Sequence, residues 1–131
     1  MPSSEYIKVK LPFYERGIIL SDYPQKVLFL CSQNKRRSLT AEHIFQEIPG
    51  IEVKSAGTES NARSKVTPGL LGWSDVIFGM EKKHIRRLQE KYADCLIGKK
   101  IVCLYIEDDY EYMAEELIDL LEAKVVDYIK K

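Results

Sequence analysis

Four short apolar runs recur along the chain and alternate with stretches of helical periodicity. Each run has four to six residues and is typical of a strand. The runs are residues 26–30, 51–54, 75–78 and 101–106, and the helical stretches are residues 38–48, 68–73, 81–92 and 113–129. Because strand–helix–strand units close by right-handed crossovers, we expect an α/β fold: an open four-stranded parallel sheet with helices on both faces.

The length of the chain predicts one such domain. A chain of 131 residues can bury a single hydrophobic core, and two cores would each be small. We expect residues 26–131 to form the α/β domain and residues 1–25 to be an N-terminal extension. Two weak strand-like pieces in the extension, at 7–11 and 18–20, are expected either to add an edge strand or to cover an edge of the sheet.

Composition limits the partners of this domain. Lys+Arg and Asp+Glu number 20 each, so no basic excess favours nucleic acid or an anionic membrane surface. No apolar run approaches the ~18 residues of a spanning helix, and the first residues lack the apolar core of a secretory signal. We therefore expect a cytoplasmic protein with no membrane or nucleic-acid partner.

The three cysteines and two histidines point away from a metal centre. Cys31, Cys95 and Cys103 show neither C-x-x-C spacing nor the Cys/His spacing of a zinc site. His43 and His84 lie in predicted helices without a cysteine or carboxylate at ligand spacing, so both are expected to be structural or solvated. We expect no metal and no other cofactor.

The segment from Cys31 to Ser38 carries the strongest chemical signal. It follows the first predicted strand, opens into a helix and contains Lys35, Arg36 and Arg37. Ligands of open α/β sheets bind outside the carboxyl ends of the strands, and a helix N-terminus attracts anions. A five-residue loop at this position can turn its backbone N–H groups toward one point, so we expect it to bind a phosphate group.

The residue types in this loop also suit covalent chemistry. The field of the helix N-terminus and the arginines favours the thiolate form of Cys31, which is a competent nucleophile. The guanidinium of Arg37 can hold two phosphoryl oxygens with two parallel hydrogen bonds. Ser38 can donate a hydrogen bond to the cysteine sulfur.

Four segments, in order, resemble one known family. VLFLCSQNKRRSLTAE is similar to the C-x5-R-S signature of the low-molecular-weight protein tyrosine phosphatases. The other matches are residues 53–58, with a Ser-Ala-Gly-Thr turn, residues 73–81, with a Met-Glu helix start, and residues 106–110, which resemble the family's late Asp-Pro-Tyr segment. C-x5-R alone is a loose motif, whereas the ordered set is specific.

The resemblance implies a protein tyrosine phosphatase that acts through a phosphocysteine intermediate without metal. Its substrate would be a phosphotyrosyl protein or a small phosphomonoester. The implied catalytic residues are Cys31, Arg37 and an aspartic acid, which family matching places at Asp108, while the residues alone do not choose between Asp108 and Asp109. A structural alternative is that both aspartates cap the last helix. The implied substrate-binding residues are Ser32, Gln33, Asn34, Lys35, Arg36, Ser38 and Tyr110.

Several positions depart from the family pattern. Gln33 stands where the family usually has Gly, and Lys35 and Arg36 replace less charged residues, which makes the mouth of the site more cationic. Residues 59–65 lack the aromatic residue that usually walls the phosphotyrosine cleft. Tyr110 and Tyr112 would either supply such a wall or pack on the last helix, and the sequence favours neither.

Three other functions share parts of this pattern. A catalytically degenerate module would bind phosphate or a phosphoprotein without turnover. The related arsenate reductases need two further cysteines, and Cys95 and Cys103 come later than the family's relay positions. A phosphocysteine carrier also uses a strand-end cysteine but has no need of Arg37. Redox regulation of Cys31 by Cys95 or Cys103 stays open at this stage.

Overall fold

The computed structural model describes residues 25–129 and confirms the expected α/β fold. The strand-like pieces expected at 7–11 and 18–20 lie outside the described residues. The elements, in chain order, are β1 (Gln25–Cys31), α3 (Arg37–Phe45), β2 (Ile51–Gly57), α4 (Pro68–Trp73), β3 (Val76–Gly79), α5 (Lys82–Tyr92), η1 (Ala93–Leu96), β4 (Lys100–Cys103) and α6 (Glu115–Ile129).

The four strands form one parallel sheet in the order β2-β1-β3-β4. β1 therefore lies between β2 and β3. The chain passes from β1 to β2 on one side of it, and the next connection crosses back to β3 on the other side. Ligand sites in open α/β sheets lie at this kind of switch point, beyond the carboxyl ends of the strands. The loop that follows Cys31 starts there.

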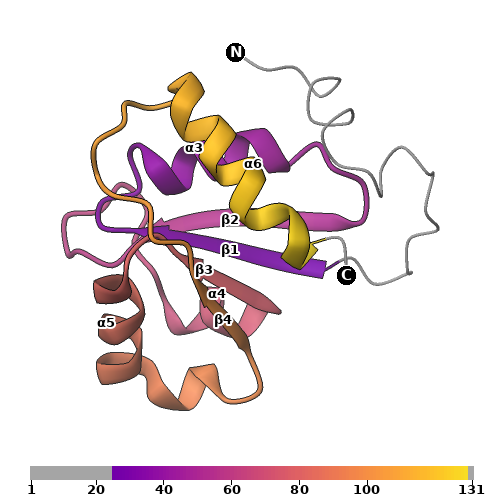
Figure 1. Ribbon diagram of the computed structural model, residues 1–131. Helices are drawn as coiled ribbons and strands as arrows, with labels where there is room; N and C mark the ends of the chain where they lie inside the picture. Colours follow the sequence, from indigo (N-terminus) through magenta and orange to yellow (C-terminus); the bar gives the residue numbers. More distant parts are fainter. Residues whose placement is uncertain (1–24, 130–131) are drawn as a thin grey trace.

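Helices cover both faces of the sheet, with α3 and α6 on one face and α4 and α5 on the other (Figure 1). The alternation along β1 explains the two layers, because successive strand side chains point to opposite faces. Val27, Phe29 and Cys31 join the core under α3 and α6, while Leu28 and Leu30 join the core under α4 and α5. All five side chains are buried, which accounts for the uninterrupted apolar run in the sequence.

The end of the fourth strand differs from the prediction. β4 stops at Cys103, although the apolar run extends to residue 106. Tyr105 has a φ of +55°, in the left-handed region, so the chain turns out of the sheet there. Leu104 and Ile106 still donate backbone hydrogen bonds to the carbonyls of Gly79 and Met80, so the turn stays attached to the end of β3. It directs residues 106–112 toward the loop after β1.

Helix boundaries agree with the sequence where the capping chemistry is clear. The side chain of Thr67 accepts a hydrogen bond from the Leu70 N–H and Pro68 occupies the first turn of α4, which spans the expected residues 68–73. α3 ends at Phe45 rather than at residue 48, and α6 begins at Glu115 rather than at residue 113. Met113 has a φ of +62°, which is incompatible with a helical turn at that position.

None of the helices within residues 25–129 combines the length and apolar character required to cross a membrane. In the same part of the chain, no three His, Cys, Asp or Glu side chains come close enough together to hold a metal ion.

Candidate active site

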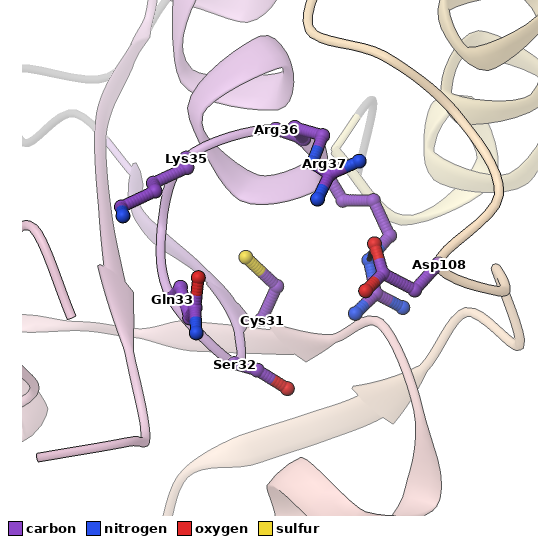
Figure 2. Close-up of a pocket in the computed structure, with 7 residues that line it drawn as sticks. All are labelled: Cys31, Ser32, Gln33, Lys35, Arg36, Arg37 and Asp108. Atoms are coloured by element: carbon purple, nitrogen blue, oxygen red, sulfur yellow. Dashed lines mark ion pairs between the residues drawn. The ribbon is translucent and has the colours of Figure 1, made fainter. Parts of the chain in front are cut away.

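A cavity of about 180 Å³ opens at the carboxyl end of β1. Its lining residues are Cys31, Ser32, Gln33, Lys35, Arg36, Arg37 and Asp108. Figure 2 shows the loop arched around the Cys31 sulfur, with Arg37 and Asp108 on one side. The structure thus brings together seven of the eleven site residues expected from the sequence; Asn34, Ser38, Asp109 and Tyr110 are not among the lining residues.

The loop is held in its curl through its carbonyl oxygens. The carbonyls of Cys31 and Ser32 accept hydrogen bonds from the N–H groups of Thr58 and Glu59, at 3.0 and 2.9 Å. The carbonyl of Gln33 accepts from the Arg63 N–H at 2.9 Å, and the carbonyl of Asn34 accepts from Arg63 Nε at 3.0 Å. With four successive carbonyls directed outward to the segment after β2, the loop amides are left to face inward, as an anion-binding loop requires.

Gly57 permits this close packing of β2 against the loop. A Cβ on Gly57 would lie 2.6 Å from the Ser32 carbonyl oxygen and 2.5 Å from Ala62 Cβ. Both distances are shorter than van der Waals contact, and one of the partners is backbone that cannot move without opening the loop. The glycine of the Ser-Ala-Gly-Thr turn is therefore needed for space.

Asn34 lies behind the loop, fully buried, with a φ of +59°. Asparagine tolerates this left-handed conformation better than most residues. Its Nδ2 donates to Ser38 Oγ at 2.7 Å and to Ser55 Oγ at 2.8 Å, and its Oδ1 accepts from Arg63 Nη2 at 2.8 Å. Every polar atom of the side chain is bonded, so Asn34 shapes the loop from within and does not line the cavity.

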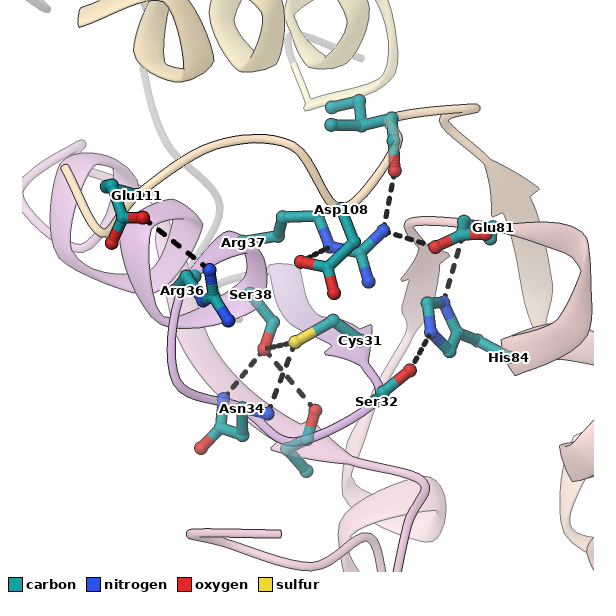
Figure 3. A network of polar contacts seen from close by, with 12 residues as sticks. Cys31, Ser32, Asn34, Arg36, Arg37, Ser38, Glu81, His84, Asp108 and Glu111 are labelled. Carbon is teal, nitrogen blue, oxygen red and sulfur yellow. Dashed lines mark hydrogen bonds and ion pairs between the residues drawn. The ribbon is translucent and has the colours of Figure 1, made fainter. Parts of the chain in front are cut away.

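The Cys31 sulfur receives two contacts from this framework (Figure 3). The Asn34 backbone N–H donates to Sγ at 3.2 Å, and Ser38 Oγ lies 2.9 Å from Sγ. Ser38 Oγ accepts a hydrogen bond from Asn34 Nδ2, and its own hydrogen can be donated to the sulfur or to the Ala56 carbonyl oxygen at 3.4 Å, of which the sulfur is closer. These contacts stabilise negative charge on sulfur, in the manner expected of Ser38 from the sequence.

Arg37 is almost fully buried and is fixed at one end of its guanidinium. Its Nη1 donates to Glu81 Oε2 at 2.6 Å and to the Ile106 carbonyl at 2.7 Å. Nε and Nη2 lie on the side away from these anchors and are oriented for a phosphoryl group. Burial alone would raise the pKa of Glu81, but the hydrogen bond and charge of Arg37 outweigh it and lower that pKa, so Glu81 stays ionised as the counter-ion.

His84 supports the first residue of the loop, a role that the sequence analysis missed. Its Nδ1 accepts the Glu81 N–H at 3.0 Å, so in the neutral ring the proton sits on Nε2, which donates to Ser32 Oγ at 3.0 Å. Burial, reinforced by the Arg37 charge, lowers the pKa of His84 to about 4. The imidazole is therefore neutral at physiological pH and holds the Ser32 hydroxyl at the edge of the cavity.

The two candidate aspartates are separated by the fold. Asp108 lines the cavity, and its Oδ1 lies 3.7 Å from Arg37 Nε. Asp109 is exposed and is not among the lining residues. The alternative that both aspartates cap the last helix is wrong, because α6 begins at Glu115, well beyond them.

The segment that carries Asp108 is attached to α3 and to Arg36, the residue before it. Glu111 forms an ion pair with Arg36 at 3.7 Å, the Tyr112 hydroxyl is hydrogen-bonded to His43 Nδ1, and the Met113 N–H donates to Thr40 Oγ1 at 2.9 Å. Tyr110 packs against the core beneath α6, and the Tyr112 ring meets the edge of the His43 ring. Neither tyrosine forms an aromatic wall for the cavity.

Four supporting residues of the site were not singled out from the sequence: Ser55, Arg63, Glu81 and His84. A weak signal existed for Glu81 and His84, since their three-residue spacing at a helix start matches a reciprocal capping arrangement. Arg63 gave no signal, because its role depends on where the segment after β2 passes the loop.

The remaining cysteines lie away from Cys31. Cys103 pairs with Gly79 across β3 and β4, and Gly79 pairs with Leu30 of β1, so two strand spacings, ~10 Å, separate β1 from β4. A disulfide needs Cα atoms within about 7 Å. Cys95 belongs to η1, beyond the far end of α5. A disulfide between Cys31 and Cys103 would therefore require the strands to move.

The resemblance to the low-molecular-weight phosphatases is confirmed by comparison with known proteins. Residues 26–74 match the family model described as low molecular weight phosphotyrosine protein phosphatase. This range contains the loop, α3, β2 and α4. No curated protein matches the chain in sequence.

Solved structures share the fold at low sequence identity. The low molecular weight protein tyrosine phosphatase SP-PTP from Streptococcus pyogenes has a TM-score of 0.66 at 20% identity, covering 80% of this chain and 91% of its own. Vibrio vulnificus Wzb, in complex with benzylphosphonate, has a TM-score of 0.60 at 20% identity, with 81% and 94% covered. The YwlE arginine phosphatase from Geobacillus stearothermophilus has a TM-score of 0.54 at 21% identity, with 82% and 86% covered. The family match supports phosphatase chemistry, and the neighbours include phosphatases of two substrate types.

Proposed function

We propose that this chain, which matches the low molecular weight phosphotyrosine protein phosphatase model over residues 26–74 and shares that fold, is a cysteine-dependent phosphomonoester hydrolase. One observation carries the proposal. The Cys31 sulfur lies at the centre of a loop whose carbonyls are turned outward, beside an arginine that is anchored from behind and an aspartate that shares the cavity. A nucleophile, an anion cradle and an acid thus meet in one cavity.

In the first step the Cys31 thiolate attacks phosphorus in line with the ester oxygen. The S–P bond forms as the P–O bond breaks, and the Asp108 carboxyl donates its proton to the departing oxygen. The loop amides and Nε and Nη2 of Arg37, the edge that does not contact Glu81, hold the equatorial oxygens, which carry the negative charge of the transition state. Glu81 and the Ile106 carbonyl keep the guanidinium in place.

In the second step water attacks the phosphocysteine. The Asp108 carboxylate takes a proton from the water, the S–P bond breaks, and inorganic phosphate leaves. The electron pair returns to sulfur, where the Asn34 N–H and the Ser38 hydroxyl stabilise the thiolate. The cycle is balanced without metal or redox chemistry.

Which phosphorylated group is the substrate, an ester with a P–O bond such as phosphotyrosine or a phosphoramidate with a P–N bond such as phosphoarginine, is a separate question from the mechanism. The family resemblance favours phosphotyrosine, but neighbouring structures include arginine phosphatases as well. No aromatic residue of the described chain is among those that line the cavity, so nothing there favours a phenyl ring. We therefore propose phosphomonoesters as the substrate class, of which phosphotyrosine is one member.

The other functions fit the arrangement less well. A module that binds phosphate without turnover would have no use for Asp108 beside Arg37, whereas a hydrolase needs it there. An arsenate reductase relay would need a cysteine within reach of Cys31, and Cys103 lies two strands away.

Hydrolysis of p-nitrophenyl phosphate in excess EDTA and reductant tests the proposal. We expect turnover by the intact protein that is abolished in Cys31→Ser, while Cys31→Ser still binds phosphate or vanadate. Cys95→Ser and Cys103→Ser are matched controls and should retain turnover. A folded, vanadate-binding protein without turnover would contradict the hydrolase proposal and favour the binding module.

A further inference from the structure

The cavity lining carries two cationic side chains besides the arginine that would hold the phosphoryl group. Its lining contains three cationic side chains, Lys35, Arg36 and Arg37, against the single carboxylate of Asp108. The phosphoryl group of a substrate is met by the inward loop amides and by the free edge of Arg37. Lys35 and Arg36 lie further out: both side chains are exposed, and Figure 2 shows them on two sides of the cavity mouth, with Lys35 directed away from Arg36.

These two outer cations are largely available to a ligand. Within residues 25–129, no acidic side chain forms an ion pair with Lys35. Arg36 is paired with Glu111 at 3.7 Å, and the Glu111 side chain is 87% exposed. Exposed ion pairs of this kind are weak because water screens them, so a second anion can compete for Arg36.

The walls provide little apolar surface for the alcohol part of a substrate. Besides the ionised groups, the lining consists of Cys31, Ser32 and Gln33. Tyr110 is packed on the core and Tyr112 on His43, so both are engaged elsewhere. Recognition of the leaving group must therefore come from charge and hydrogen bonds.

We propose that Lys35 and Arg36 form a second anion subsite, and that the preferred substrate is a small phosphomonoester whose alcohol carries a further anionic group, such as a second phosphate or a carboxylate. This proposal rests on the hydrolase function proposed above and narrows its substrate class. The loop amides and Arg37 bind the phosphoryl group that is transferred, and Lys35 and Arg36 bind the second anion at the mouth.

Binding of non-hydrolysable phosphonates tests the subsite without depending on turnover. The probes are 3- and 4-carboxybenzylphosphonate, each compared by calorimetry with its neutral carbamoyl isostere. At low salt we expect the carboxylate to bind about three- to tenfold more tightly for at least one ring position. The ratio should fall toward one near 1 M salt, where the screening length is about 3 Å.

Three variants assign the effect to residues. Lys35→Met should lower the ratio of the affinity for the carboxylate probe to that for its carbamoyl isostere. Glu111→Gln, which frees Arg36, should keep or increase this ratio. Lys91→Met, at an exposed position near the end of α5 outside the cavity lining, is the matched control and should leave it unchanged. A ratio that survives in the Lys35→Met/Arg36→Met double variant would overturn the assignment.

The outcomes separate the two proposals. If both members of each pair bind equally, the subsite is contradicted and the hydrolase proposal stands. If no phosphonate binds to the folded protein, the phosphate site itself fails, and both proposals fall. Tighter binding of an acidic than of a neutral phosphotyrosine peptide, with no gain for the carboxylated phosphonates, would overturn the small-substrate proposal and assign the cations to protein recognition.

Discussion

The two chain segments that meet in the cavity are held in different ways. The loop from Cys31 to Arg37 is braced from behind by buried groups: Asn34, Arg37 and Ser38 are at most 2% exposed, and their hydrogen bonds connect three parts of the chain. The segment that carries Asp108 is fixed in the core at Ile106 and at Met113, whose N–H donates to the buried Thr40, but between them the side chains of Asp108 and Glu111 are 54% and 87% exposed.

This difference follows from what each segment does. An anion cradle must have its amides aligned before the substrate arrives, because reorganisation would cost part of the stabilisation of the transition state. An acid needs to reach the leaving oxygen of different esters, and a segment attached at the surface can adjust. Substitutions in the loop framework should therefore be severe, and substitutions around the acid should be graded.

The largest effect is expected at Asn34. Asn34→Ala removes three side-chain hydrogen bonds and puts alanine, which tolerates the left-handed region less well than asparagine, at a φ of +59°. We therefore expect kcat/KM to fall by at least about 100-fold and the free energy of unfolding by about 1–3 kcal/mol. Asn34→Gly relieves the backbone strain but not the lost bonds. Turnover and urea unfolding of both variants separate the effect of the lost hydrogen bonds from that of the backbone strain. Wild-type turnover in Asn34→Ala would contradict the bracing role.

A second test replaces the two aspartates one at a time. Asp108→Asn should lower kcat for phenyl phosphate, whose leaving group is poor, by about 10²- to 10⁴-fold. Its effect on kcat for p-nitrophenyl phosphate should be smaller, because that leaving group needs less help from an acid. Asp109→Asn is the matched control, since Asp109 lies outside the cavity lining, and should stay close to wild type. Equal losses in the two variants would refute the assignment of the acid.

His84 gives the loop framework a pH dependence of stability. The folded-state pKa of about 4 lies below the unfolded value of 6.5, so the unfolded chain binds more protons between these pH values. Stability from this group is fully present above pH 6.5 and decreases as pH falls toward 4, by about 3 kcal/mol in total. Urea unfolding of wild type and His84→Gln from pH 7 to 4 should show a flatter curve for the variant; parallel curves would contradict the role of His84.

The smallest effect is expected at the surface attachment of the acid segment. Tyr112→Phe removes the hydrogen bond to His43 and keeps the ring contact, so kcat for phenyl phosphate should fall about two- to fivefold at unchanged KM. Turnover of p-nitrophenyl phosphate should hardly change. A loss equal to that of Asn34→Ala would show that the two segments are not held differently.

The strands and the loop could be predicted because their signals are local. β1 reads as an apolar run followed by Cys31, and Asn34 suits a left-handed position wherever the loop is placed. The run at 101–106 misled the prediction of β4, because apolarity indicates burial and Leu104 and Ile106 are buried outside the sheet.

The framework behind the loop could not be predicted because it depends on long-range packing. Arg63 reaches Asn34 across 29 positions, and Arg37 reaches Glu81 across 44. Local periodicity carries no information about such pairs. Residue type alone did not distinguish Asp108 from Asp109; family matching favoured Asp108, and the fold places Asp108 in the cavity lining.

The most direct test of the account is whether phosphate becomes attached to Cys31 during turnover. In Asp108→Asn, p-nitrophenyl phosphate can still transfer its phosphoryl group, because its leaving group needs little acid assistance, while hydrolysis of the intermediate is slowed. Rapid quenching followed by mass spectrometry should find one phosphoryl group on the peptide that contains Cys31, and none on that peptide in Cys31→Ala, which has no nucleophile at this position. Hydrolysis that proceeds without this adduct and survives in Cys31→Ala would contradict the account.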